Sequence, residues 1–121
     1  MILTTTKGDD VTENAKAYLK RYAPAKRLVQ FMKSTLENCT SETEKKQIKK
    51  VISDNQKLID EIYALVLRLP ADAETLLLID LRYIQDMSVE EVCSTLHISK
   101  STYHTHHKNA LKLLKEMREK K

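Results

Sequence analysis

The sequence predicts an all-α protein, in which an N-terminal helical hairpin of coiled-coil character precedes a compact C-terminal helical domain. Only one glycine and two prolines occur among the 121 residues. This leaves few residues for the tight turns of a sheet protein. Apolar residues in the long segments recur at steps of three and four, which is the spacing of one helix face.

The first predicted helix follows a polar segment, residues 1–11, which has no periodic apolar face and which we expect to be disordered. Thr12 can cap the helix that follows. Pro24 lies inside this helix, so we expect a kink or break near Tyr22–Ala23, because proline lacks a backbone donor and clashes with the preceding turn. The apolar stripe consists of Ala15, Tyr18, Tyr22, Ala25, Val29, Met32 and Leu36.

The second predicted helix carries the longest apolar stripe. Ser41 and Glu44 have the spacing of a capping box at its start. Two facing stripes joined by a tight turn predict an antiparallel hairpin over residues 12–69. The stripe is wider than one short helix can cover, so we expect residues 12–69 also to form a homo-oligomer. The candidate oligomerisation residues are Ile48, Val51, Asn55, Leu58, Ile62 and Leu65.

Asn55 is the polar member of this stripe. A buried asparagine can fix the register and strand number of a coiled coil. The alternative interpretation is that Asn55 lies at the margin of the stripe and hydrogen-bonds to water.

Residues 70–121 predict a helix-turn-helix DNA-binding domain. A helix opened by Pro70 or Asp72 leads to a turn at 85–87, and Ser88 with Glu91 forms a second capping box. The short helix Val89–Leu96, a turn at 97–98 and a last helix capped by Ser99 then follow. In such a motif the second helix places its N-terminal turns in the major groove.

Charge is divided sharply within this domain. Residues 70–98 hold one basic and six acidic residues, a net charge of −5, whereas residues 99–121 hold seven basic and two acidic residues, a net charge of +5. Three of the four histidines also lie in residues 99–121. We expect the basic part to face double-stranded DNA.

The stretch from Leu77 to Leu114 resembles region 4 of bacterial sigma-70 factors, through "LRY" at 81–83, "SVEEVCSTLHIS" at 88–99 and "STYHTHHKNALKLL" at 101–114. The "VCSTLHIS" at 92–99, with a helical N-terminal half, is similar to the RinA/ArpU-type phage regulators. This resemblance implies an activator of late or packaging genes of a phage or mobile element. It also implies contact with RNA polymerase, for which the acidic residues 72–91 are a candidate surface. His97 and Met87 stand where sigma region 4 usually has loop glycines.

The outward positions of the last helix are the candidate DNA contacts, and the resemblance matches them to base- and phosphate-contacting positions. Lys100 and Lys108 would contact phosphates or guanine edges, and short side chains between them would reach base edges. His106 falls on the inner side, where we expect a partly buried histidine. The candidate DNA-binding residues are Ser99, Lys100, Ser101, Thr102, His104, Thr105, His107, Lys108 and Lys112.

Other functions have weaker support. No glycine-rich phosphate loop or nucleophile signature occurs, so we predict neither an enzyme nor a cofactor. We predict no metal site, because a zinc site would need the pair His104/His107 to converge on the pair Cys93/His97. The apolar runs are too short to span a membrane, and we expect a cytoplasmic protein with reduced thiols. Two alternatives are a small terminase-type DNA-packaging subunit and a helical protein–protein adaptor that does not bind DNA.

Overall fold

The computed structural model describes residues 13–119, and within that range it contains helices and no strands, which confirms the all-α fold class. The predictions for residues 1–11 and for the Thr12 cap lie outside the described residues. Residues 13–20 form a first helix. The elements after it are α2 (Tyr22–Glu37), α3 (Glu42–Leu67), α4 (Ala73–Ile79), the π-helical turn η1 (Asp80–Ile84), α5 (Val89–Leu96) and α6 (Lys100–Glu119).

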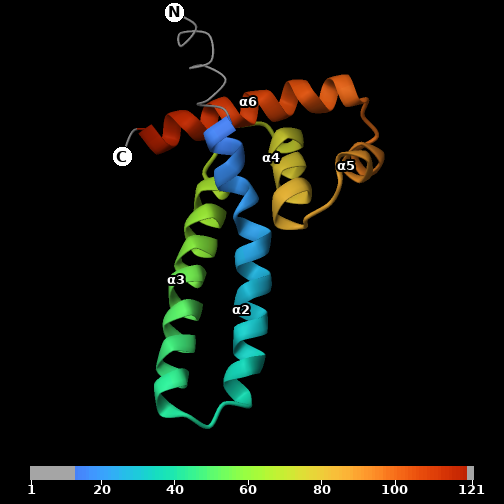
Figure 1. Ribbon diagram of the computed structural model, residues 1–121. Coiled ribbons are helices and arrows are strands. Elements are labelled where there is room, and N and C mark those ends of the chain that lie inside the picture. The colour runs from blue at the N-terminus through green and yellow to red at the C-terminus, as the bar shows by residue number, and fades with distance from the viewer. Residues whose placement is uncertain (1–12, 120–121) are drawn as a thin grey trace, which may run out of the picture.

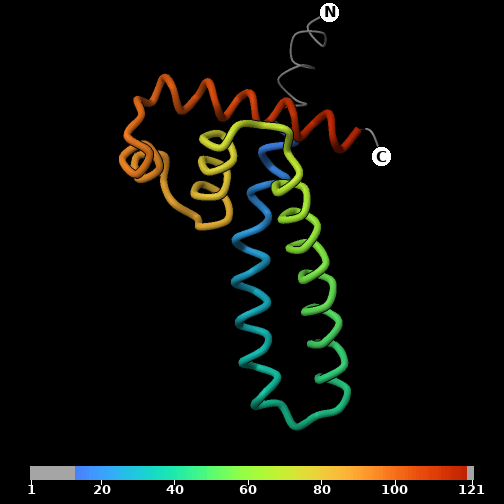
Figure 2. Tube along the Cα trace, turned by 180° about the vertical axis from the view of Figure 1, so that it is seen from behind, coloured from blue at the N-terminus to red at the C-terminus, as the bar shows by residue number. Residues whose placement is uncertain are grey.

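α2 and α3 lie side by side as the predicted antiparallel hairpin, and helix 13–20 continues the line of α2 (Figures 1 and 2). The break predicted near Tyr22–Ala23 is found one residue earlier, at Arg21. Pro24 consequently lies in the first turn of α2, where a helix tolerates a residue without a backbone N–H. The chain direction changes little there, because Ala25 N donates to Arg21 O at 3.2 Å.

Ser41, in the turn between the two hairpin helices, caps the start of α3, as predicted. Ser41 Oγ accepts from Glu44 N at 3.3 Å. The Glu44 carboxylate differs from the prediction, because it accepts from Cys39 Sγ at 3.6 Å. The Glu44 carboxylate therefore stabilises the turn and does not complete the capping box.

The core of the hairpin is built from the two predicted stripes. Ile62 and Leu65, expected at an oligomer interface, are 0% and 5% exposed within the hairpin's own core. The other four candidates precede these two in α3 and are only half-buried: Ile48, Val51, Asn55 and Leu58. Asn55 Nδ2 donates to Val51 O at 2.8 Å, so its amide hydrogen-bonds within its own helix.

α6 lies across one end of the hairpin, with α4 and α5 beside it, as both views show (Figures 1 and 2). Buried side chains of α4, α5 and α6 join those of the hairpin in one continuous core. Leu78, Val92 and Leu114 are each 0% exposed at its centre.

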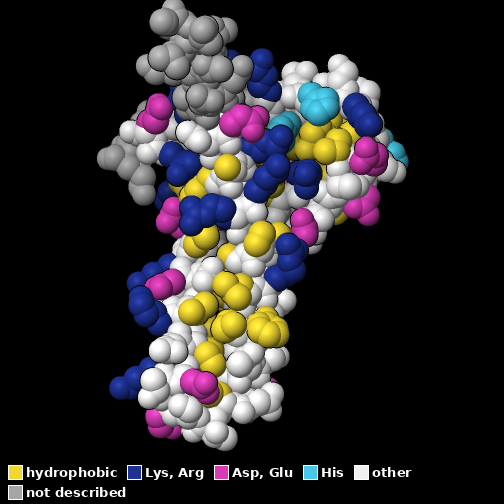
Figure 3. Space-filling model, in the orientation of Figure 1, with side chains coloured by type: hydrophobic (Ala, Val, Ile, Leu, Met, Phe, Trp, Pro, Cys, Tyr) yellow, Lys and Arg dark blue, Asp and Glu magenta, His cyan; other side chains and the backbone are white. Residues whose placement is uncertain are grey.

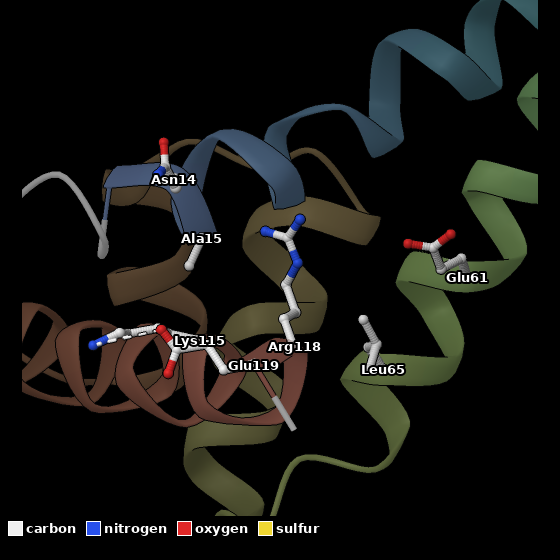
Figure 4. A pocket seen from close by; sticks show the side chains of 7 residues that line it. All are labelled: Asn14, Ala15, Glu61, Leu65, Lys115, Arg118 and Glu119. Carbon is white, nitrogen blue, oxygen red and sulfur yellow. Dashed lines mark ion pairs between the residues drawn. The ribbon is translucent and has the colours of Figure 1, made fainter. Parts of the chain in front are cut away.

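The far end of α6 meets helix 13–20 and α3 around a pocket of about 340 Å³ (Figure 4). The Arg118 guanidinium lies 3.9 Å from the centre of the Tyr18 ring. The Tyr18 hydroxyl donates to the Glu61 carboxylate of α3. We call this group of Tyr18, Glu61 and Arg118 the clamp, because it joins the first helix, the hairpin and α6.

Candidate nucleic-acid interface

α5 begins with the predicted capping box. Ser88 N donates to Glu91 Oε1 at 2.9 Å, and Glu91 N donates to Ser88 Oγ at 3.1 Å. These two bonds satisfy backbone donors that the helix itself leaves free. The predicted bounds Val89–Leu96 are confirmed.

The turn between α5 and α6 depends on a left-handed residue. His97 has φ 58° and ψ 47°, the conformation that the glycine of sigma region 4 would adopt at little cost. Ile98 N donates to Cys93 O at 3.0 Å and closes the end of α5. A non-glycine residue in this conformation costs about 1 kcal/mol.

The loop before α5 also contains a left-handed residue, but it is Asp86 at φ 61° and not Met87. Aspartate tolerates this conformation better than methionine, since its short polar side chain can make local hydrogen bonds. The Asp86 carboxylate also accepts from Arg27 Nη1 of α2 at 2.9 Å, which ties the loop to the hairpin.

α6 begins where the sequence predicts. Ser99 Oγ accepts from Thr102 N at 3.1 Å and caps the helix. Thr102 is half-buried and its Oγ1 accepts from Ser99 Oγ at 3.1 Å, so both side chains are partly occupied by the cap. Thr105 Oγ1 donates to Ser101 O at 3.1 Å and keeps its lone pairs for another donor.

An exposed row of side chains follows the start of α6, and we call it the reading face. Lys100 is held by Glu90 of α5, with Nζ to Oε2 at 3.4 Å, although both side chains are mostly exposed. His104 lies edge-on to Tyr103, with ring centres 5.3 Å apart. The reading face consists of Lys100, Ser101, His104, Thr105, Lys108 and Lys112, all exposed.

His107, one of the candidate DNA-binding residues, is half-buried and turned toward η1. Its ring stacks on Tyr83 and on Tyr103, with centres 5.7 and 5.4 Å away, and Nε2 lies 2.5 Å from the Tyr83 hydroxyl. Burial, followed by the nearby positive charges of Lys16 and Arg82, lowers the pKa of His107 to about 4. Burial also raises the pKa of Tyr83, so its hydroxyl stays protonated and donates to the neutral imidazole. We therefore leave His107 out of the candidate interface.

His106 is partly buried, as predicted, with 23% of its side chain exposed. Its Nε2 lies 2.8 Å from Glu74 Oε1, and its Nδ1 lies 3.1 Å from Thr75 Oγ1. Both ring nitrogens therefore hold α6 against α4. Across residues 13–119, the structure brings together no group of three or more His, Cys, Asp or Glu that could hold a metal ion.

The acidic residues between 72 and 91 mostly act within the fold. Asp72 Oδ1 accepts from Thr75 N at 2.8 Å, and hydrogen bonding by Thr75 lowers the pKa of the Asp72 carboxyl. Glu91 closes a capping box, while Glu74, Asp86 and Glu90 pair with cationic or histidine side chains. The predicted acidic segment is therefore largely engaged in internal contacts.

Basic side chains gather at the α6 end of the molecule, in the view of Figure 3. The His107 ring of α6 is affected by the charges of three cations that were not predicted as site residues: Arg82 of η1, and Lys16 and Lys20 of the first helix. Arg82 Nη1 donates to Met87 O at 3.0 Å. No sequence motif predicts a role for Lys16 or Lys20. Their charges act on α6, which lies some 90 residues later in the chain, and a local pattern does not reveal such proximity.

A known protein family matches the part of the chain that contains this site. Residues 59–114 match the model of the family Sigma-70, region 4, a range from the second half of α3 into α6. The chain therefore contains a sigma region 4-like helix-turn-helix domain, which is a DNA-binding regulatory module. No curated protein and no solved structure matches the chain. In the described residues, no helix is long and apolar enough to cross a membrane.

Proposed function

We propose that this protein is a sequence-specific DNA-binding transcriptional regulator that activates late or packaging genes of a phage or mobile element. The observation that carries the proposal is the reading face: an exposed row on α6, directly after a capped turn, in a sigma region 4-like domain. The N-terminal turns of α6 would enter the major groove, while α5 braces them against the backbone.

The residues of the reading face divide by the contacts that their chemistry allows. Lys100, Lys108 and Lys112 carry flexible charges suited to phosphates. Ser101, His104 and Thr105 offer hydroxyl or imidazole groups to base edges. Sequence preference would then come chiefly from the second group, and affinity from the first.

Selection of duplexes from a random-sequence library by the purified full-length protein tests this function. We expect an enriched motif that is bound in gel-shift assays. His104→Ala with Thr105→Ala should reduce discrimination between the motif and a scrambled duplex by about 1–3 kcal/mol per lost base contact. Lys46→Gln, an exposed lysine near the start of α3, serves as the control and should change neither motif nor affinity. Failure to enrich any motif would refute sequence-specific binding.

Transcription from a template carrying the selected motif upstream of a promoter then tests activation. With bacterial RNA polymerase, we expect more transcript when the protein is present, and no increase with the reading-face variant. A DNA-packaging role predicts instead that the protein leaves transcription unchanged and co-purifies with a large ATPase subunit.

We further propose that the hairpin forms a homo-oligomer through its end remote from α6. Ile48 and Val51 are only half-buried there, and Phe31 of α2 is 64% exposed, which leaves apolar surface for another copy. Sedimentation equilibrium should give a mass above 14.0 kDa, and Val51→Asp with Phe31→Asp should return it to the monomer. A monomer at all concentrations would contradict self-association.

A further inference from the structure

We propose that the first helix extends the DNA interface beyond the sigma region 4-like domain, with Lys16 and Lys20 binding the phosphate backbone of the duplex that α6 reads. This inference rests on the DNA binding proposed above. It concerns residues outside the matched range 59–114, so the family resemblance does not supply it.

The first helix is fixed rigidly beside α6. Ala15, Tyr18 and Leu19 are 1%, 4% and 1% exposed, so one face of helix 13–20 is fully packed. The clamp adds the Arg118 guanidinium, which stacks on Tyr18 from the last turn of α6. A side chain on this helix therefore keeps a constant position relative to the reading face.

Lys16 and Lys20 lie one helical turn apart and thus on one face of this helix. Lys20 is exposed and Lys16 is half-buried. Both are close enough to His107 of α6 for their charges to act on its ring, and the Arg82 guanidinium acts there too. Both backbone views show the first helix lying against α6 (Figures 1 and 2), so the three cations lie on the flank of α6 that carries His107.

Acidic side chains also lie near this helix: the Glu61 carboxylate accepts from Tyr18 in the clamp. Glu13, on the same helix, lies near Tyr83 and helps to raise the pKa of that hydroxyl. Figure 3 shows dark blue Lys and Arg side chains close to cyan His side chains at this end of the molecule.

A phosphate backbone is the partner that suits this flank. A helix lying in the major groove has a sugar–phosphate backbone along each side, and cations beside the helix meet those phosphates. Lysine acts there as a flexible point charge that needs no fixed approach angle. Arg82 is already bonded to Met87 O and lies over the Tyr83 ring, so the two lysines are the freer cations.

The test compares two double variants. One carries Lys16→Gln together with Lys20→Gln, and the control carries Lys46→Gln together with Lys49→Gln. Both double variants remove two positive charges, but residues 46 and 49 are exposed near the start of α3, far from α6 (Figure 1). The probe is the library-selected duplex, and its affinity is measured from 50 to 300 mM KCl. Each lost phosphate contact lowers the slope of log K against log salt by about 0.9, so we expect the first variant to lose about 2 and the control none.

Lysine labelling of the wild-type protein gives a second readout that needs no substitution. Acetylation followed by mass spectrometry should show Lys16 and Lys20 protected by the duplex, together with Lys100 and Lys108, while Lys46 and Lys49 react equally with and without DNA. An unchanged salt slope in the Lys16/Lys20 variant, or full labelling of both lysines in the complex, would overturn the inference while leaving binding by α6 intact. If the wild-type protein bound no duplex, the proposed function would fail and this inference with it.

Discussion

His97 shows how a single residue sets the geometry of the reading face. It lies in the left-handed region and ends α5, so the direction of α6 depends on it. Cβ crowding makes this conformation unfavourable for histidine, whereas glycine adopts it freely. The protein therefore carries a local strain at the joint between the two helices of its helix-turn-helix motif.

His97→Gly should raise the free energy of unfolding by about 1 kcal/mol, because it removes this strain. Urea unfolding followed by circular dichroism measures the change. Ser94→Gly is the matched control: residue 94 is exposed inside α5, and glycine there should cost about 0.5 kcal/mol. A destabilised His97→Gly variant would show that the imidazole makes a contribution beyond the backbone conformation.

Glu90 restrains a residue of the reading face. Its carboxylate holds Lys100 Nζ at 3.4 Å and would also repel an approaching phosphate. Glu90→Gln should therefore tighten DNA binding, by roughly threefold to tenfold at low salt. Fluorescence anisotropy with the selected duplex measures this effect. Stability should hardly change, since exposed ion pairs contribute little.

Asp54→Asn is the matched control for this prediction. It likewise removes an acid paired to a lysine, with Lys50 Nζ at 3.2 Å from Asp54 Oδ2, but in the part of α3 remote from α6. Its affinity for DNA should stay close to that of the wild type. Equal gains in the two variants would mean that net charge alone, and not the release of Lys100, governs binding.

At the scale of elements, α6 is joined to η1 by a neutral histidine. Tyr83 of η1 donates to His107, and the low pKa of about 4 keeps this imidazole uncharged at neutral pH. An unfolded chain would bind a proton at this residue near pH 6.5. Between pH 6.5 and pH 4 the unfolded state therefore binds more protons, and stability falls as the pH falls.

This contribution should reach at most about 3 kcal/mol at pH 4. Urea unfolding of His107→Gln and of the wild type, at intervals from pH 7 to pH 4, measures it as the difference between the two slopes. His104→Gln, which removes an exposed histidine one turn away, should keep the wild-type slope. The same acid sensitivity in His107→Gln as in the wild type would place its origin elsewhere, for example in the paired carboxylates.

The elements differ in how well the sequence predicts them. Ser88, Asp72 and Ser99 cap their helices as expected, because a cap depends on residues within one turn. The π-helical turn η1 was not predicted, since its five residues follow directly on α4 and are too few for a change of apolar spacing to be recognised. The contact of His107 with η1 was not predicted for a related reason. Its partner Tyr83 lies 24 residues away, and a projection of α6 alone cannot reveal this contact.

At the scale of the whole molecule, the hairpin and the sigma region 4-like domain share one core. This packing depends on contacts between the two ends of the chain, which periodicity does not predict. A protein of this size with one continuous core is expected to unfold in a single transition. The first helix should therefore be needed for the stability of the DNA-binding domain.

Leu19→Ala tests this dependence. Leu19 is 1% exposed, and its truncation should cost about 2–5 kcal/mol. Circular dichroism and DNA binding should be lost together at a lower urea concentration. Leu67→Ala is the control, because Leu67 is 63% exposed and should cost far less. Hydrogen exchange in which α6 keeps its protection while the hairpin opens would show two independent units.

The clamp at the end of α6 has a mechanical consequence. α6 has 20 residues and is thus about 30 Å long, with the clamp at one end and the start of the reading face at the other. A tilt of about 5° at Arg118 would swing the first turn by roughly 2.5 Å, close to the length of a hydrogen bond. A substitution around the Tyr18 ring that tilted α6 against its contacts at His106 and His107 would therefore change which bases are read without touching the DNA.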